Sequence, residues 1–224
     1  MKTYHEQLLR QVGEERDRIL SRRGLLQGSV GVAAGAAAFG IGVRSGGLGL
    51  SSVAAQDEME NPFEDDIAVL NYALTLEHLE NAFYRDGVGL YQHGPDAFGN
   101  DINVYLTEIG AHELAHVETL VQVITDLGGE PVEEATYDFG YTDAISFRAT
   151  AAALENTGVS AYDGAGQYLE NRDLITAAGS IVAVEARHAS YLNLITGAEP
   201  APEAFEQAKS PDEILEIAGP FIVQ

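Results

Sequence analysis

The 224-residue sequence contains no cysteine, which excludes a disulfide framework, a thiolate metal site and a cysteine nucleophile. Basic residues are also few, since 12 Lys and Arg stand against 35 Asp and Glu and give a net charge of −23. Such an excess of negative charge argues against nucleic acid or an anionic membrane surface as a partner. The length suits one domain of ordinary size.

The first 55 residues differ from the rest and resemble a twin-arginine export signal. Arg22 and Arg23 precede a weakly apolar run at 24–43 that is rich in Gly and Ala, and small residues at 52–56 offer a cleavage site. This composition suits a signal better than a bilayer-spanning helix. We expect export by the twin-arginine translocase to an extracytoplasmic location. The protein is then secreted, or membrane-anchored if the signal stays uncleaved; a disordered basic tail is the remaining interpretation.

Removing this segment makes the chain still more acidic. Residues 1–55 hold seven of the basic and four of the acidic residues, so the remainder has five basic and 31 acidic residues, a net charge of −26 over 169 residues. A surface of this charge repels itself at low salt and is relieved by screening. We hypothesise that the protein works in high salt, as proteins of halophilic organisms do.

Four long helical patterns follow a linker at 56–64 and end at glycines or turn residues. The tail at 198–224 contains Ser210 and Glu213 in the spacing of a capping box, which predicts one short helix there. The fold class is therefore all-α, with a four-helix bundle over 65–197. The expected helices cover about 65–86, 101–128, 143–169 and 173–197.

The connection between the second and third helices indicates the topology. About a dozen extended residues at 130–142 reach roughly 40 Å, which is close to the length of a 28-residue helix. The chain can therefore return along the bundle and start the third helix parallel to the second. A long crossover of this kind is the ferritin-like variant of the four-helix bundle.

Two of the helices carry a seam of residues three and four apart, which is the pattern of a face directed into a bundle core. Glu113 and His116 are the only non-aliphatic members of one seam, and Glu185 and His188 of the other. Charged side chains in a core are costly unless they are paired or bound to metal. The seams are Ile102, Leu106, Ile109, Glu113, His116, Leu120, Val123 and Leu127, and Leu174, Ala178, Ile181, Glu185, His188, Leu192 and Ile195.

The other two helices each place one glutamate on the corresponding line, Glu77 and Glu155, with a tyrosine seven residues later. Counted from the expected helix starts, all four glutamates lie 12 residues in, so they can converge at one level of the bundle. The chain also reads as two related halves. LEHLENAFY (76–84) mirrors LENTGVSAY (154–162), and HELAHVETL (112–120) mirrors VEARHASYL (184–192).

Chemistry limits what such a cluster contains. Four carboxylates and two neutral imidazoles carry about −4, and without cations they would raise each other's pKa values. Two divalent cations neutralise the set. Oxygen ligands with one imidazole per metal suit iron or manganese, with zinc as an alternative. One Glu from each of two helices plus Glu-x-x-His from each of the others is the di-iron or di-manganese carboxylate arrangement.

Over most of 65–197 the chain resembles the ferritin-like superfamily, and most of all its exported branch related to desiccation-related proteins. The stretches that carry the resemblance are VLNYALTLEHLENAFY, ALENTGVSAYDGAG and IVAVEARHASYL. The resemblance implies that Glu113 and Glu185 bridge two metals, iron being favoured over manganese. It also implies that Glu77 with His116, and Glu155 with His188, complete the two ligand sets. Tyr84 and Tyr162 would donate hydrogen bonds to carboxylates from outside the ligand sets or simply fill the core.

The chain departs from one branch of that superfamily, the rubrerythrins. It lacks their cysteine-held iron domain, and Gly158 stands where they carry an extra glutamate. Glu80 is expected to lie outside the ligand set or in solvent, rather than to act as a spare ligand. His78 and His112 adjoin ligands in sequence but should point away from the site, because neighbouring helical residues diverge. His93 is given no role, and Arg148 is expected to pair with a carboxylate or to be exposed.

Three functions remain open, and no catalytic residue is assigned. The first is an oxidoreductase that acts on peroxide, dioxygen or ferrous ion, with metal ions and small oxidants as partners. The second is iron storage, which requires a homo-oligomeric shell. The third is a non-catalytic stress or envelope protein in which the metal only stabilises the fold. Complete ligand sets for both metals favour the first.

Overall fold

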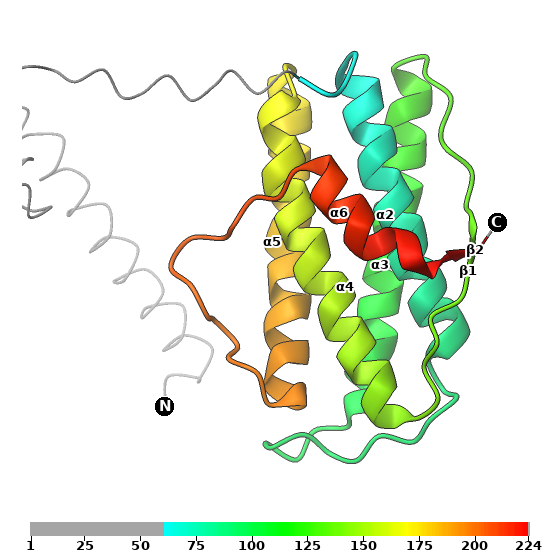
Figure 1. Cartoon of the computed structure of the whole chain (residues 1–224), viewed down its shortest axis with the longest axis vertical. Coiled ribbons are helices and arrows are strands. Elements are labelled where there is room, and N and C mark those ends of the chain that lie inside the picture. The colour runs from blue at the N-terminus through cyan, green and yellow to red at the C-terminus, as the bar shows by residue number, and fades with distance from the viewer. Residues whose placement is uncertain (1–60, 224) are drawn as a thin grey trace, which may run out of the picture. The chain divides into compact units, whose positions relative to one another are not determined.

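The computed structural model describes residues 61–223, and four long helices make up most of this part of the chain (Figure 1). These helices begin and end within a few residues of the positions that the sequence predicts. The prediction of an all-α bundle is therefore confirmed. The bounds of the helices are α2 Asp66–Gly87, α3 Ile102–Asp126, α4 Ala144–Ala165 and α5 Arg172–Thr196.

The largest difference lies at the end of the third helix. The pattern predicts a helix to residue 169, whereas α4 ends at Ala165 and a 3-10 turn, η1 Gly166–Tyr168, follows it. Two glycines near this end, Gly164 and Gly166, have low helix propensity and weaken the last turn. The chain can therefore reverse direction early and enter α5.

Short polar side chains fix where the helices begin. The residue before each helix is Asp or Asn, and its side chain accepts a backbone N–H of the first turn. At the other end of α5, Gly197 has a φ of 84°, a left-handed conformation that glycine adopts readily and that ends the helix. The four caps are Asp65, Asp101, Asp143 and Asn171.

The connection between α3 and α4, residues 127–143, runs along the bundle from one end to the other (Figure 1). Asn71 of α2 anchors it, because its Nδ2 donates to the Glu130 carbonyl at 3.1 Å and its Oδ1 accepts from the Val132 amide at 2.7 Å. His78 Nε2 lies 3.1 Å from the Val132 carbonyl oxygen. The helices α3 and α4 therefore run in the same direction, as the predicted crossover requires.

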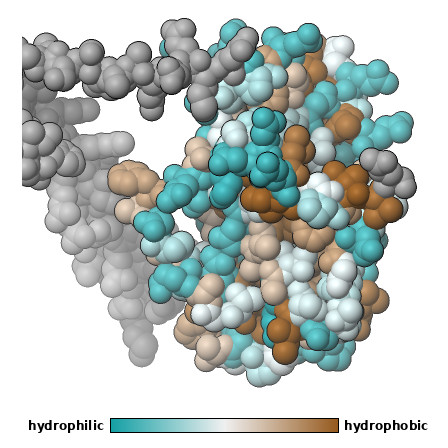
Figure 2. Space-filling model, in the orientation of Figure 1, coloured by the Kyte–Doolittle hydropathy of each residue, from teal (hydrophilic) through white to brown (hydrophobic). Residues whose placement is uncertain are grey.

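The tail after α5 folds back and crosses the bundle (Figure 1). Its helix α6, Pro211–Ala218, begins with the predicted capping box, in which Ser210 and Glu213 bond each other's backbone amides. Figure 2 shows the face that α6 crosses, where hydrophilic and hydrophobic residues are interspersed. After α6 come η2 Gly219–Phe221 and β2 Ile222–Val223, which pairs antiparallel with β1 Thr136–Tyr137 of the crossover.

Two apolar clusters fill the bundle, one toward each end of the helices. Along α3, Leu106 and Ile109 belong to the first cluster and Leu120 and Ile124 to the second. Glu113 lies between the two pairs and is fully buried. The same order holds on the other helices, so a polar layer separates two apolar layers. The first cluster includes Leu79, Phe83, Phe147, Leu154 and Leu192, and the second Leu74, Tyr162, Leu174 and Ile181.

The expected signal at 1–55 and most of the linker at 56–64 lie outside the described residues. Within 61–223, none of the helices has both the length and the apolar character that crossing a membrane requires. The proposal of export therefore rests on the sequence pattern of residues 1–55 alone.

Candidate metal centre

Six side chains meet in the polar layer, one from each of α2 and α4 and two from each of α3 and α5. The four glutamates are completely buried, and the side chains of His116 and His188 are 12% and 5% exposed. These are the six residues that the sequence predicts as metal ligands: Glu77, Glu113, His116, Glu155, Glu185 and His188.

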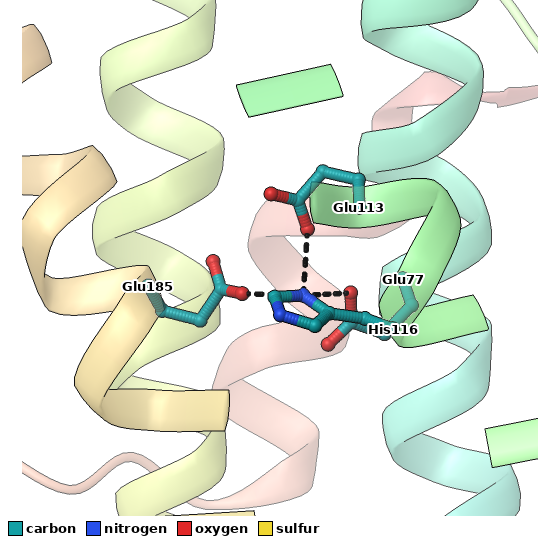
Figure 3. Close-up of side chains that lie close together, drawn as sticks. All are labelled: Glu77, Glu113, His116 and Glu185. Carbon is teal, nitrogen blue, oxygen red and sulfur yellow. Dashed lines mark hydrogen bonds and ion pairs between the residues drawn. The ribbon is translucent and has the colours of Figure 1, made fainter. Parts of the chain in front are cut away.

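One half of the cluster is centred on His116 (Figure 3). Its Nδ1 atom lies 2.9 Å from Glu185 Oε1, 3.2 Å from Glu113 Oε2 and 3.3 Å from Glu77 Oε2. Three carboxylates from three helices thus converge on one ring nitrogen. One donor atom from each of these four residues lies within 4.8 Å of the others, a spacing that a single metal ion can span.

The other half repeats this arrangement around His188. Its Nδ1 atom lies 3.0 Å from Glu113 Oε1, 3.1 Å from Glu155 Oε2 and 3.6 Å from Glu185 Oε2. The four donor groups again lie within 4.8 Å of one another. Glu113 and Glu185 take part in both halves and offer a different oxygen to each imidazole. They therefore lie where two bridging carboxylates would lie.

Several carboxylate oxygens of the cluster lack a hydrogen-bond donor among the described residues, and this bears on whether a cation fits there. Each Nδ1 carries at most one proton, yet it faces three carboxylate oxygens. Glu77 Oε2, Glu113 Oε1 and both oxygens of Glu185 receive no hydrogen bond of good geometry within the described residues. Buried carboxylate oxygens without donors are costly. A divalent cation in each half would satisfy them, so the buried Glu and His groups could hold metal ions.

Burial and mutual repulsion raise the pKa values of two of the carboxylates. Burial, followed by the charges of Glu185 and Glu113, raises the pKa of Glu77 to about 8, although the close approach of the His116 ring nitrogen opposes the rise. Burial, followed by repulsion from Glu113 and Glu185, holds the pKa of Glu155 well above its ordinary value. Without metal, these carboxyl groups therefore retain protons near neutral pH.

The imidazoles shift in the direction that compensates for this charge. Burial opposes the charged ring, but the close approach of three glutamates to each ring outweighs burial and raises the pKa values of His116 and His188 to about 12. Burial acts against ionised Glu185 too, yet the close approach of the His116 and His188 ring nitrogens lowers its pKa to about 2. Without metal, two imidazolium ions thus neutralise part of the carboxylate charge, and metal binding must displace their protons.

Two buried tyrosines form hydrogen bonds with the two glutamates that belong to only one half of the cluster, Glu77 and Glu155. Tyr84 of α2 donates to Glu155 Oε1 of α4 at 2.6 Å, and Tyr162 of α4 donates to Glu77 Oε1 of α2 at 2.5 Å. Each helix thus supports the glutamate of the other. The bonds leave the second oxygen of each glutamate facing an imidazole.

Glu80 lies in the same polar layer and outside both ligand groups, in agreement with the first of its two expected places and not with the second, which was solvent. It is 3% exposed, and a Cβ atom built at Gly158 would lie only 2.8 Å from Glu80 Oε1. The missing side chain at Gly158 therefore makes room for this fifth buried carboxylate. Burial, followed by the charge of Glu155, holds the pKa of Glu80 well above its ordinary value. Glu80 does not belong to either four-residue group.

The expectation that His112 points away from the site is also wrong. Its Nδ1 atom lies 2.9 Å from Nε2 of His188, the ring nitrogen on the side opposite the carboxylates. The prediction considered only the divergence of neighbouring residues on α3 and not the approach of α5. A usable signal was present, because His112 precedes His116 by four residues and such residues share one side of a helix.

The remaining candidates lie away from the cluster. His78 is buried beneath the crossover, where it contacts Val132. Within residues 61–223, no carboxylate pairs with Arg148, and its side chain is partly buried. Its Nη1 lies 3.0 Å from Nδ1 of His93, so this ring nitrogen is the acceptor. The proximity of this cation, after burial, lowers the pKa of His93. A neutral His93 can accept this bond, which explains the departure from the expected ion pair.

Comparisons with known proteins agree with the fold of this chain. Residues 65–198 match the family described as "Ferritin-like domain", which is more than half of the chain. Among solved structures, the crystal structure of a conserved hypothetical protein, rv2844, from Mycobacterium tuberculosis is similar, with a TM-score of 0.51 and 21% identity. The similarity covers 62% of this chain and 94% of that one, and at this identity it shows the fold alone. No curated protein matches the chain significantly.

Proposed function

We propose, from the premise that this chain belongs to the ferritin-like domain family, that its polar layer holds two divalent metal ions for redox chemistry. Glu113 and Glu185 would bridge the two ions. Each remaining pair of one glutamate and one histidine would complete one ligand set. These pairs are Glu77 with His116 and Glu155 with His188.

The observation that supports this proposal best is the convergence of three buried carboxylates on Nδ1 of each histidine. Four of the carboxylate oxygens in this arrangement have no hydrogen-bond donor among the described residues. A purely structural bundle would be more stable with aliphatic residues at these positions, because burying charge is costly. The arrangement is therefore best explained by a ligand of high positive charge.

The donor set favours iron, with manganese as the alternative. Each position offers three carboxylates and one imidazole, and no thiolate is present in the chain. Hard oxygen donors with a single imidazole suit these metals better than copper. When bound, a pair of such ions would supply electrons to peroxide or dioxygen from its reduced state, or accept electrons from ferrous ion in its oxidised state.

The chain's own residues would orient and isolate the metals. Tyr84 and Tyr162 donate to one carboxylate oxygen of Glu155 and of Glu77, respectively. The second oxygen of each glutamate stays directed at the histidine of its ligand set. The apolar clusters at both ends of the layer exclude water from the bundle axis. Low polarity around the site strengthens every electrostatic interaction within it.

The cellular setting of the proposal comes from the sequence. A twin-arginine signal at 1–55 would deliver the protein to an extracytoplasmic location in a folded state, so the metals could be bound before export. Detection of the protein outside the cytoplasm, and its loss when Arg22 and Arg23 are both replaced by lysine, would test this part. Retained export of that variant would contradict it.

Metal content tests the central proposal. The full chain should be purified in high salt, and its iron, manganese and zinc counted by plasma mass spectrometry. We expect about two ions per chain in the wild type, since two ligand groups are present. A Glu113→Ala/His188→Ala variant should lose them. A matched control, Glu118→Ala, alters an exposed glutamate of the same helix and should keep both ions.

Two results would contradict the proposal. One is a wild-type chain that binds no metal after incubation with ferrous or manganous ion, and the other is a double variant that retains both ions. With two metals established, peroxide consumption and ferrous oxidation are the next measurements. Metal-dependent folding without turnover would assign the site a structural role instead.

A further inference from the structure

We infer that the two metal positions differ in affinity, and that His112 is a positioning residue that makes the Glu155–His188 position the tighter one. The inference rests on the proposed dinuclear function and goes beyond it. It starts from an asymmetry in a site that is otherwise built from two similar halves.

The two halves of the sequence place the same ligands at the same spacing. In HELAHVETL and VEARHASYL, Glu113 corresponds to Glu185 and His116 to His188. The residue before the glutamate differs, because it is His112 in the first half and Val184 in the second. A valine side chain cannot form a hydrogen bond. The difference therefore gives a polar partner to one half of the site and withholds it from the other.

The partner reaches across from α3 to α5. Nδ1 of His112 lies 2.9 Å from Nε2 of His188, and the two rings are inclined by only 9° with centroids 5.2 Å apart. The other ring nitrogen of His188 faces Glu113, Glu155 and Glu185. Both nitrogens of this ligand therefore have partners, and its ring orientation is fixed from both sides.

His116 lacks the corresponding support. Its Nδ1 faces carboxylates just as that of His188 does, but no residue within 61–223 hydrogen-bonds to its Nε2. Its side chain is also more exposed, at 12% against 5% for His188. The ring of His116 is thus held by the carboxylates alone.

The hydrogen bond affects metal affinity through the tautomer. A metal ion at Nδ1 of His188 needs the lone pair of that atom, so the proton of a neutral ring must lie on Nε2. Nδ1 of His112 is placed to accept that proton's hydrogen bond. Such outer partners orient a ligand and raise its basicity, and their loss typically reduces metal affinity by about 10–100-fold.

Cobalt(II) is a suitable probe, because its visible absorption reports ligation without any catalytic turnover. Metal-free full-length chain should be titrated with cobalt(II) in competition with a chelator of known affinity. We expect two binding steps in the wild type. His112→Leu should weaken the tighter step by about 10–100-fold while total binding stays at two ions. His112 is exposed, so this change should leave the melting temperature of the metal-free chain almost unaltered.

A conservative variant at position 112 separates the effect of the hydrogen-bond acceptor from the effect of side-chain volume. The side-chain oxygen of asparagine occupies nearly the place of Nδ1 of histidine, so His112→Asn keeps an acceptor and should recover most of the affinity. Double variants identify the position concerned. His112→Leu should lower the affinity for the ion that a His116→Ala chain still binds. It should not change the affinity for the ion that a His188→Ala chain still binds.

The outcomes distinguish this inference from the proposed function. Absence of cobalt binding in the wild type would overturn both. Two ions bound with equal affinity, or a His112→Leu chain with unchanged affinities, would overturn the inequality and leave the dinuclear site standing. An equal effect of His112→Leu in the His116→Ala and His188→Ala chains would show that His112 does not act through His188.

Discussion

At the residue scale, the site consists of groups that oppose folding unless they are neutralised. Glu77, Glu113, Glu155 and Glu185 are each fully buried within one layer of the bundle. Protons and imidazolium ions neutralise them when metal is absent, which is visible in the raised pKa values of Glu77 and of both histidines. Metal and protons therefore compete for the same atoms.

This competition predicts how pH affects the metal-free chain. The pKa of Glu77 is about 8 in the folded state and near 4.5 when unfolded, so the folded state binds the extra proton between these values. The stability that this proton confers is complete below pH 4.5 and is lost as the pH rises toward 8. The histidines act in the same direction above pH 6.5, since their folded pKa values are about 12.

We therefore expect the free energy of unfolding, measured by urea denaturation with chelator present, to be lower at pH 8 than at pH 5. The difference should be on the order of 1 kcal/mol or more, since one pKa unit corresponds to about 1.4 kcal/mol. Glu77→Gln, which removes the titrating group, should reduce the dependence, whereas the exposed control Glu118→Gln should not. A rise in stability over this interval would show that the buried glutamates are not held protonated.

At the scale of elements, the crossover and the C-terminal tail cover two of the four long helices more than the other two. The helices α2 and α4 bury residues on nearly all sides, while α3 and α5 bury little more than the seam that faces the core. The crossover packs on α2, and the tail packs on α4, where Lys209 bonds the backbone and side chain of Ser160. These two irregular segments therefore protect the helices that carry Glu77 and Glu155.

The docking of the tail depends on Gly164. A Cβ atom at this position would overlap the Lys209 carbonyl, which is rigid backbone. We expect Gly164→Ala to lower the free energy of unfolding by about 1–3 kcal/mol and to expose the tail to limited proteolysis. The control Gly179→Ala, at a helical glycine with open space around it, should stabilise the chain by up to about 1 kcal/mol. Equal effects of the two changes would contradict this role for the tail.

At the scale of the whole molecule, acidic residues dominate the surface. The formal net charge is −23, and the buried glutamates account for only a small part of it. Such a surface destabilises the compact state through self-repulsion, which salt screens. The screening length falls from about 10 Å at 0.1 M to about 3 Å at 1 M salt.

We accordingly expect the urea midpoint of the full chain to rise between low and molar sodium chloride, as the proposal of a high-salt environment requires. Urea is uncharged, so the titration itself does not alter the ionic strength. The same series with metal-loaded protein would separate surface screening from effects on the site. A midpoint that is independent of salt would remove the support for that environment.

The sequence by itself determined the secondary structure and the layer in which the polar residues meet. Helix periodicity and capping residues set the helices, and an interrupted aliphatic seam singled out Glu113, His116, Glu185 and His188. Such local patterns can be recognised in the sequence because helix geometry fixes which residues lie on the same face. The ligand role of the six residues stays a prediction until metal is measured.

Only the tertiary structure decided which side chains surround that layer. His112 and Glu80 reach their positions through contacts with another helix, at His188 of α5 and Gly158 of α4. The pairing of the C-terminal strand with the crossover joins residues far apart in sequence. Periodicity along α3 places His112 on the same side of the helix as His116, but it does not give the partner. The contacts themselves depend on how closely neighbouring helices approach and on which gaps a small residue leaves open.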